Sequence, residues 1–173
     1  MKTPLALAVL ALTQIGPAAA QAPVADAFRT LAQEAATNLV AAAEEMPADK
    51  YGFKPTPAQM SFGDIVGHLS RGNDFLCGKI AGATPPKRTE LDKTASKTAM
   101  VARLKETFQY CASSLAKVDD SKLAEKMTLF GSKQVTRAET LFITAQDWAD
   151  HYSQAAIYLR LNGLLPPTAK KKE

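Results

Sequence analysis

Apolar residues recur three or four positions apart in four separate stretches of this chain. Such spacing places them on one face of an α-helix, with polar residues on the opposite face. The first stretch covers residues 24–46 and stops at Pro47, which cannot continue a helix. The third, residues 101–118, alternates steps of three and four most regularly, as bundle helices do. Four amphipathic helices are therefore predicted.

The second and fourth helices carry start and stop signals. Ser61 is followed three residues later by Asp64, and Thr136 by Glu139. In this pairing the first side chain accepts a free backbone N–H of the first helical turn. Gly82 and the prolines at 85 and 86 end the second helix, and Gly163 occupies the position where the C-cap of the fourth needs a left-handed residue.

Together these helices predict an all-α protein, a four-helix bundle with long crossover connections that occupies residues 21–167. The connections 82–94 and 119–135 are long, so at least one is expected to be a crossover that is not a simple antiparallel hairpin. The second connection contains apolar side chains and is expected to pack on the bundle. No run has the period of a β-strand, so no sheet is predicted.

Residues 1–20 have the features of a signal peptide. Lys2 provides a positive start, residues 5–15 are apolar, and residues 18–20 are three alanines of the kind found before a cleavage site. Cleavage is expected after Ala20, with Ala22 as the second choice. No later segment approaches the roughly 18 to 20 apolar residues of a membrane helix. The mature protein is therefore expected to be periplasmic or secreted, with no membrane span.

Composition and net charge limit the classes of molecule that this chain is expected to bind. Apolar residues make up 46% of the chain and charged residues 22%, as in ordinary globular proteins. The net charge is +4, and three lysines of this excess lie within the C-terminal segment 168–173, which is expected to be a disordered basic tail. No helix carries a continuous basic stripe, so nucleic-acid binding is not expected.

The two cysteines, Cys77 and Cys111, do not have the spacing of a metal-binding motif. Cys111 lies on the apolar line of the third helix, and Cys77 follows a core residue of the second. Neighbouring helices can bring two such residues within the distance that a disulfide requires. Export favours a disulfide over two buried free thiols, the alternative that the spacing leaves open.

The two histidines of the chain, His68 and His151, both fall within predicted helices, at the edge of the apolar face. Asp147 precedes His151 by four residues, so their side chains share one helix face. A carboxylate and an imidazole at this spacing can chelate one divalent cation, and His68 on a facing helix would complete the set. The alternative is a surface ion pair between Asp147 and His151 that contributes a few tenths of a kcal/mol.

Several segments, in order, resemble the DinB-like family of four-helix bundles. The resemblance rests on residues 45–55 (EMPADKYGFKP), residues 61–68 (SFGDIVGH) and the last-helix ending from His151 to Gly163 and the prolines beyond it. These segments extend over residues 44–167, most of the mature chain. The resemblance implies a bundle of the metalloenzyme type, often a homodimer, with a small-molecule substrate.

The family's usual metal ligands are three histidines, one in the second helix and two spaced H-x-x-x-H on the last. In this chain the first corresponds to His68 and the third to His151, whereas Asp147 replaces the second. The resemblance thus implies a divalent ion (zinc, nickel, manganese or iron), and the carboxylate shifts the preference towards harder ions.

Two functions remain open on this basis. The first is a metal-dependent enzyme, a thiol-dependent transferase or a hydrolase of unknown substrate, as DinB-like relatives suggest. The second is a non-catalytic periplasmic binding or interaction module that has lost tight metal binding, which the replacement by Asp147 favours. A role in DNA contact is not expected, because the chain is predicted to be exported and lacks a basic face.

Overall fold

The computed structural model describes residues 22–92 and 94–170. Four α-helices form the core of this part of the chain. Their bounds are α1 Pro23–Glu45, α2 Phe62–Ala81, α3 Lys97–Leu115 and α4 Arg137–Leu161. The predicted all-α four-helix bundle is therefore confirmed. The signal peptide predicted at 1–20 lies outside the described residues.

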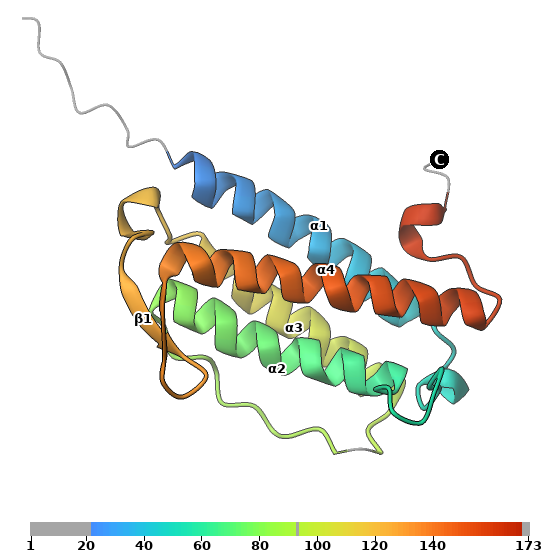
Figure 1. Cartoon of the computed structure of the whole chain (residues 1–173). Coiled ribbons are helices and arrows are strands. Elements are labelled where there is room, and N and C mark those ends of the chain that lie inside the picture. Colours follow the sequence, from blue (N-terminus) through green and yellow to red (C-terminus); the bar gives the residue numbers. More distant parts are fainter. Residues whose placement is uncertain (1–21, 93, 171–173) are drawn as a thin grey trace, which may run out of the picture.

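The helices are arranged so that α1 and α4 run in one direction and α2 and α3 in the other (Figure 1). Each helix packs against two others: α2 lies between α3 and α4, and α1 contacts the same two helices from the opposite side. Since α2 and α3 are parallel, the connection 82–96 has to run back along the length of the bundle. This is the predicted crossover.

Helix ends follow the capping signals in the sequence. The Ser61 side chain accepts from Asp64 N, the Thr136 side chain accepts from Glu139 N, and both capping boxes are complete. The hydrogen bonds to Thr136 lower the pKa of the Glu139 carboxyl. The helix α3 begins earlier than its apolar pattern suggests, because the hydroxyl of Ser96 accepts from the backbone of Ala99.

The prediction that the chain contains no strand is wrong for the connection between α3 and α4. There, β1 (Lys126–Leu129) and β2 (Lys133–Thr136) form an antiparallel hairpin. Each strand has only four residues, too few to display an alternating pattern. Leu129 and Val135 are buried against Leu76 of α2, so the connection packs on the bundle as expected.

A disulfide joins α2 to α3. Cys77 and Cys111 are bonded, with their Cα atoms 5.2 Å apart, which confirms the pairing favoured by the sequence. Both residues are fully buried in the main hydrophobic core. A covalent bond thus joins two parallel helices through cysteines that are 34 residues apart in the sequence.

The first residues of the predicted disordered tail are instead held against the bundle. Pro167–Ala169 form a short 3-10 helix, and the backbone N–H of Thr168 donates to the Tyr152 hydroxyl at 3.1 Å. The ammonium of Lys170 lies 2.5 Å from the Glu45 carboxylate. The tail prediction is therefore wrong for residues 168–170, because specific partners on α4 and α1 hold them; residues 171–173 lie outside the described part. Among the described residues, no helix combines the length and apolarity needed to cross a membrane.

Candidate metal centre

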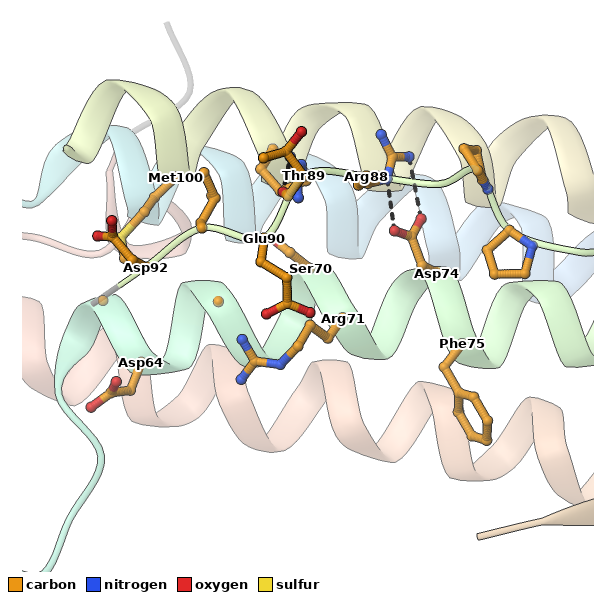
Figure 2. Close-up of a pocket in the computed structure, with 16 residues that line it drawn as sticks. Asp64, Ser70, Arg71, Asp74, Phe75, Arg88, Thr89, Glu90, Asp92 and Met100 are labelled. Atoms are coloured by element: carbon orange, nitrogen blue, oxygen red, sulfur yellow. Dashed lines mark hydrogen bonds and ion pairs between the residues drawn. The ribbon is translucent and has the colours of Figure 1, made fainter. Parts of the chain in front are cut away.

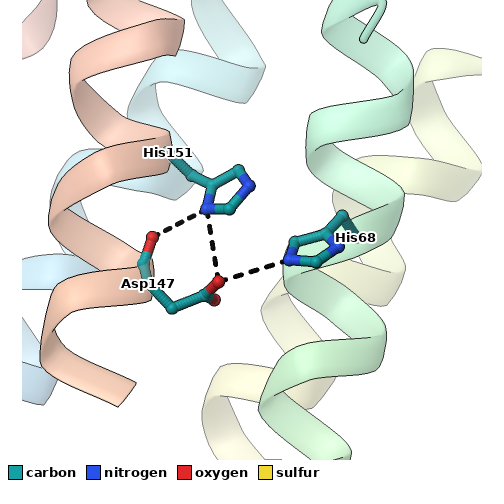
Figure 3. Close-up of side chains that lie close together, drawn as sticks. All are labelled: His68, Asp147 and His151. Carbon is teal, nitrogen blue, oxygen red and sulfur yellow. Dashed lines mark hydrogen bonds and ion pairs between the residues drawn. The ribbon is translucent and has the colours of Figure 1, made fainter. Parts of the chain in front are cut away.

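The three residues singled out by the sequence come together between α2 and α4 (Figure 3). His68 projects from α2, and Asp147 and His151 project from adjacent turns of α4. His68 Nε2 is 3.2 Å from Asp147 Oδ1, and His151 Nδ1 is 3.4 Å from the same oxygen. One ligand atom from each residue lies within 4.8 Å of the other two. A single small cation is therefore within reach of all three side chains.

The tautomer of the His151 ring follows from its contact with the backbone. Its Nδ1 lies 2.8 Å from the carbonyl oxygen of Asp147, an atom that can only accept a hydrogen bond. The proton of the neutral ring is therefore on Nδ1, and Nε2 keeps its lone pair. A histidine ligand is commonly oriented by such a hydrogen bond from its other ring nitrogen. The rings of His68 and His151 are stacked, with centroids 4.5 Å apart and planes inclined by 22°.

Exposure increases across the cluster from α4 to α2. The exposed side-chain fractions are 10% for His151, 20% for Asp147 and 42% for His68. The cluster is thus buried on one side and open to solvent on the other. An ion held there would keep coordination positions for water or for a ligand from solution.

Gly72 of α2 is a neighbour of the Asp147 carboxylate, a contact that the sequence reasoning missed. A Cβ atom added at position 72 would lie 3.5 Å from Asp147 Oδ2, which is an ordinary van der Waals distance. The glycine occurs one helical turn after His68, so the carboxylate meets the backbone of α2 instead of a side chain. A glycine four residues after a candidate histidine ligand, within a helix, was the available signal.

A buried hydrogen-bond network supports the cluster from the core side. Asn73 accepts a hydrogen bond from Trp148 Nε1 at 2.7 Å and donates one to Thr107 Oγ1 at 3.2 Å. Asn73 follows Gly72, and Trp148 follows Asp147, so the network links α2 to α4 one residue from the site. Both residues are buried at core positions of their helices.

Asp150, next to His151, does not take part in the cluster. Its carboxylate accepts a hydrogen bond from Gln154 at 2.9 Å on the exposed face of α4. Asp150 is thus a solvent-exposed charge. It also provides a neighbouring carboxylate of different environment for comparison with Asp147.

Neither of two cavities in the described part of the bundle is lined by any of the three candidate ligands. One, of about 680 Å³, lies between α2, the connection to α3 and the start of α3 (Figure 2). The other, of about 740 Å³, lies between α1 and α3. The candidate metal centre lies between α2 and α4, outside both cavities, and its His68 side is exposed to solvent.

Two of the solved structures similar to this chain are described as DinB-like proteins. One from Bacillus subtilis has a TM-score of 0.68 at 19% identity, over 84% of this chain and 99% of that chain. Another, from Bacillus cereus, has a TM-score of 0.69 at 14% identity, over 82% of this chain and 95% of that one.

A mutant of the mycothiol-dependent maleylpyruvate isomerase is similar in fold, with a TM-score of 0.60 at 10% identity, over 75% of this chain and 59% of that one. At such identities the likeness establishes the fold alone. A search of curated proteins finds no match. The sequence profile of the DinB superfamily matches residues 12–155. The chain therefore belongs to the DinB superfamily.

Proposed function

We propose that this chain binds one divalent metal ion through His68, Asp147 and His151 and uses it to act on a small molecule. The observation that carries the proposal is the convergence of three ligand atoms, from two helices, within 4.8 Å of one another. Two histidines and one carboxylate with open positions are a ligand set used by divalent transition metals in enzymes. The donors present therefore fit the ion that the superfamily implies.

The carboxylate sets the metal preference in this proposal. Asp147 adds a negative charge and a hard oxygen donor where the resemblance led us to expect an imidazole. Manganese and iron tolerate such mixed ligand sets well, while zinc and nickel also accept two imidazoles and a carboxylate. The ion is therefore zinc, nickel, manganese or iron, with a shift towards the harder ions.

Each side chain has a separate task. Asp147 Oδ1 lies close to one nitrogen of each imidazole ring, and its negative charge favours a cation there. His151 is oriented by its hydrogen bond to the Asp147 carbonyl, which keeps Nε2 free of a proton. His68, the most exposed of the three, borders the open side from which a ligand enters. When bound, the metal would acidify a water molecule or bind a thiol sulfur as thiolate.

The type of reaction is taken from one structural relative. The maleylpyruvate isomerase with a similar fold is mycothiol-dependent. We extend this to a thiol-dependent transfer, or a hydrolysis, of a small-molecule substrate in this chain. The open side of the cluster supports the proposal, because both reactions need a free coordination position.

Metal analysis tests the proposal directly. The mature protein, dialysed in turn against zinc, nickel, manganese and iron(II), is analysed by mass spectrometry for bound metal. We expect one ion per chain, lost in His68→Ala, Asp147→Ala and His151→Ala. Asp150→Ala is the matched control and should keep the ion. Absence of stoichiometric metal under every loading condition would contradict the proposal.

The alternative is a non-catalytic binding module. It is favoured by the absence of the three residues from the lining of both described cavities. In that case the melting temperature should not change with metal or chelator. An increase of several degrees on loading with one ion, reversed by chelator, would exclude the alternative, because a ligand that binds the folded state stabilises it.

We also propose that the chain is exported. The buried disulfide supports export, since such bonds persist in oxidising compartments. The helix α1 begins at Pro23, so cleavage after Ala20 or Ala22 would leave the bundle intact. N-terminal sequencing of the protein recovered from a periplasmic extract should start at Gln21 or Pro23. A start at Met1 would contradict export.

A further inference from the structure

A cavity of about 680 Å³ lies between α2, the crossover and the start of α3 (Figure 2). This volume is within the roughly 300 to 1,000 Å³ of small-molecule sites. On the α2 side, Gly63, Gly67 and Ser70 contribute no side chain or a small one, so the cavity extends close to the helix backbone. None of the three candidate metal ligands lines the cavity, which makes it a separate candidate site.

The Arg71 guanidinium lies along the α2 wall of this cavity. A Cβ atom added at Gly67 would be 3.4 Å from Arg71 Nη1, so the arginine side chain runs back one helical turn to this glycine. Figure 2 shows the same course along α2, in the direction of Asp64. Among residues 22–92 and 94–170, Arg71 has no hydrogen-bond or ion-pair partner. Each of the other described arginines has at least one.

Glu90 brings the opposite charge to the same cavity from the crossover. Figure 2 shows its side chain directed from the crossover towards α2, where the Arg71 guanidinium lies. Within the described part of the chain, the Glu90 carboxylate has no hydrogen bond and no ion pair, and this includes any contact with Arg71. One cavity is thus lined by a guanidinium and a carboxylate that do not bind each other.

The other charged side chains that line the cavity are engaged by neighbours. Their partners are Asp74 for Arg88, Glu106 and the Thr89 carbonyl for Arg103, Thr94 for Asp92, and Ser61 for Asp64. A ligand that covers Arg71 and Glu90 has to offer each a partner of opposite charge, because burying an unpaired charge is costly. The cavity therefore presents one positive and one negative group to a ligand.

The cavity also has apolar surface. Leu91 of the crossover and Met100 of α3 line it, and both are partly buried. Methionine is flexible and adapts to apolar groups of different shape. Covering these two side chains with an apolar group would remove apolar surface from water, which favours binding.

We propose that this cavity binds a small zwitterion with an apolar side chain, either a free amino acid or a short peptide. Arg71 binds its carboxylate, Glu90 binds its ammonium group, and Leu91 and Met100 contact its apolar side chain. The N–H donors of a guanidinium match the two oxygens of a carboxylate, and a carboxylate accepts from an ammonium group. The inference goes beyond the proposed function, because none of these contacts requires a metal ion.

Isothermal titration calorimetry of the mature protein in the presence of a chelator tests the site. The probes are L-leucine, L-leucyl-L-leucine, leucinamide, which lacks the carboxylate, and N-acetyl-L-leucine, which lacks the ammonium group. We expect the better zwitterion to bind about fivefold more tightly than either analogue, and the comparison of L-leucine with the dipeptide identifies the source. Arg71→Ala should abolish only the preference over leucinamide. Glu90→Gln should abolish only the preference over N-acetyl-L-leucine.

Lys87→Ala is the matched control, because Lys87 is an exposed cation of the crossover that does not line the cavity. It should leave all four affinities unchanged. Equal binding of zwitterions and analogues by the wild type, or an equal effect of Arg71→Ala on L-leucine and leucinamide, would overturn the proposal. So would the absence of binding heat from every probe at millimolar concentration, the result expected if Arg71 and Glu90 pair with each other in solution.

Failure of the proposed function gives a different result. The titrations are made without metal, so a chain that binds no metal ion but still prefers the zwitterions contradicts the metal centre alone. Arg71 and Glu90 are exposed, and their single variants should therefore melt close to the wild-type temperature. This check separates loss of binding from loss of folding.

Discussion

The two faces of α2 differ in how firmly they are held. The face towards α3 is anchored by the Cys77–Cys111 disulfide and the buried Asn73–Thr107 hydrogen bond. The face towards α4 carries the candidate metal centre, where His68 contacts Asp147 at 3.2 Å and is half-exposed. The contacts with α3 fix the position of α2. His68, on the face towards α4, is therefore held in a defined place although its own surroundings are partly solvent.

A salt-bridge network adds to the contacts that hold α2 to α3. The Arg88 guanidinium in the connection between α2 and α3 donates to both carboxylate oxygens of Asp74, at 2.7 and 3.2 Å (Figure 2). It also donates to Glu106 at 2.9 Å. The hydrogen bond to Asp74 raises the pKa of Arg88 further. Arg88 and Asp74 are both largely buried. The crossover is therefore attached to both helices that it connects.

Removing the disulfide should have the largest effect on how firmly the α3-facing side of α2 is held. We expect Cys77→Ala/Cys111→Ala to lower the free energy of unfolding by about 2 to 4 kcal/mol, because the cross-link restricts the unfolded chain and both sulfurs are buried. Urea unfolding followed by the fluorescence of Trp148, the single tryptophan of the chain, measures the loss. Reductant should destabilise the wild type and leave the double variant unchanged; equal sensitivity of both would contradict the prediction.

The next largest effect is expected from the buried network. Asn73→Ala leaves Trp148 Nε1 without its acceptor in the core, and should cost about 1 to 3 kcal/mol. The same urea titration measures it. In the metal-free chain, His68→Ala on the open face should change stability by no more than about 0.5 kcal/mol. If the two variants were equally stable, the contrast between the buried network at Asn73 and the exposed position of His68 would be wrong.

A smaller effect is expected from the crossover. Arg88→Ala should cost about 1 kcal/mol, since it removes the charged hydrogen bonds to Asp74 and Glu106. Amide hydrogen exchange should become faster in residues 83–92 while the helices keep their protection. Lys87→Ala, at the exposed neighbouring position, is the control. Uniform acceleration across α2 and α3 would show that the network holds the whole bundle instead of the connection.

Helices, caps and candidate ligands could be predicted from the sequence because each depends on local spacing. The Asp147–His151 pair needs only the helical repeat, and the caps at Ser61 and Thr136 need only a few residues. The pairing of Cys77 with Cys111 required one further assumption, that α2 and α3 are neighbours. These features were recognised without knowledge of the tertiary structure.

Other features depend on tertiary contacts that leave little local signal. Strands β1 and β2 are too short to show an alternating pattern, and they are held by burial of Leu129 and Val135 against α2. Asn73 has the position of a core residue, and its polar role emerges only when Trp148 and Thr107 converge on it. The ordering of Lys170 depends on Glu45, which is 125 residues away in the chain.

The burial of Cys77 and Cys111 has a kinetic consequence. Thiol–disulfide exchange requires a thiolate to reach a sulfur atom, and in the folded chain both cysteines are covered by the core. Dissolved reductants should therefore attack only molecules in which α2 and α3 have transiently separated. The rate at which the thiols become accessible to an alkylating reagent under mild reduction would then measure how often these rare openings occur. The disulfide thus reports on local unfolding between α2 and α3.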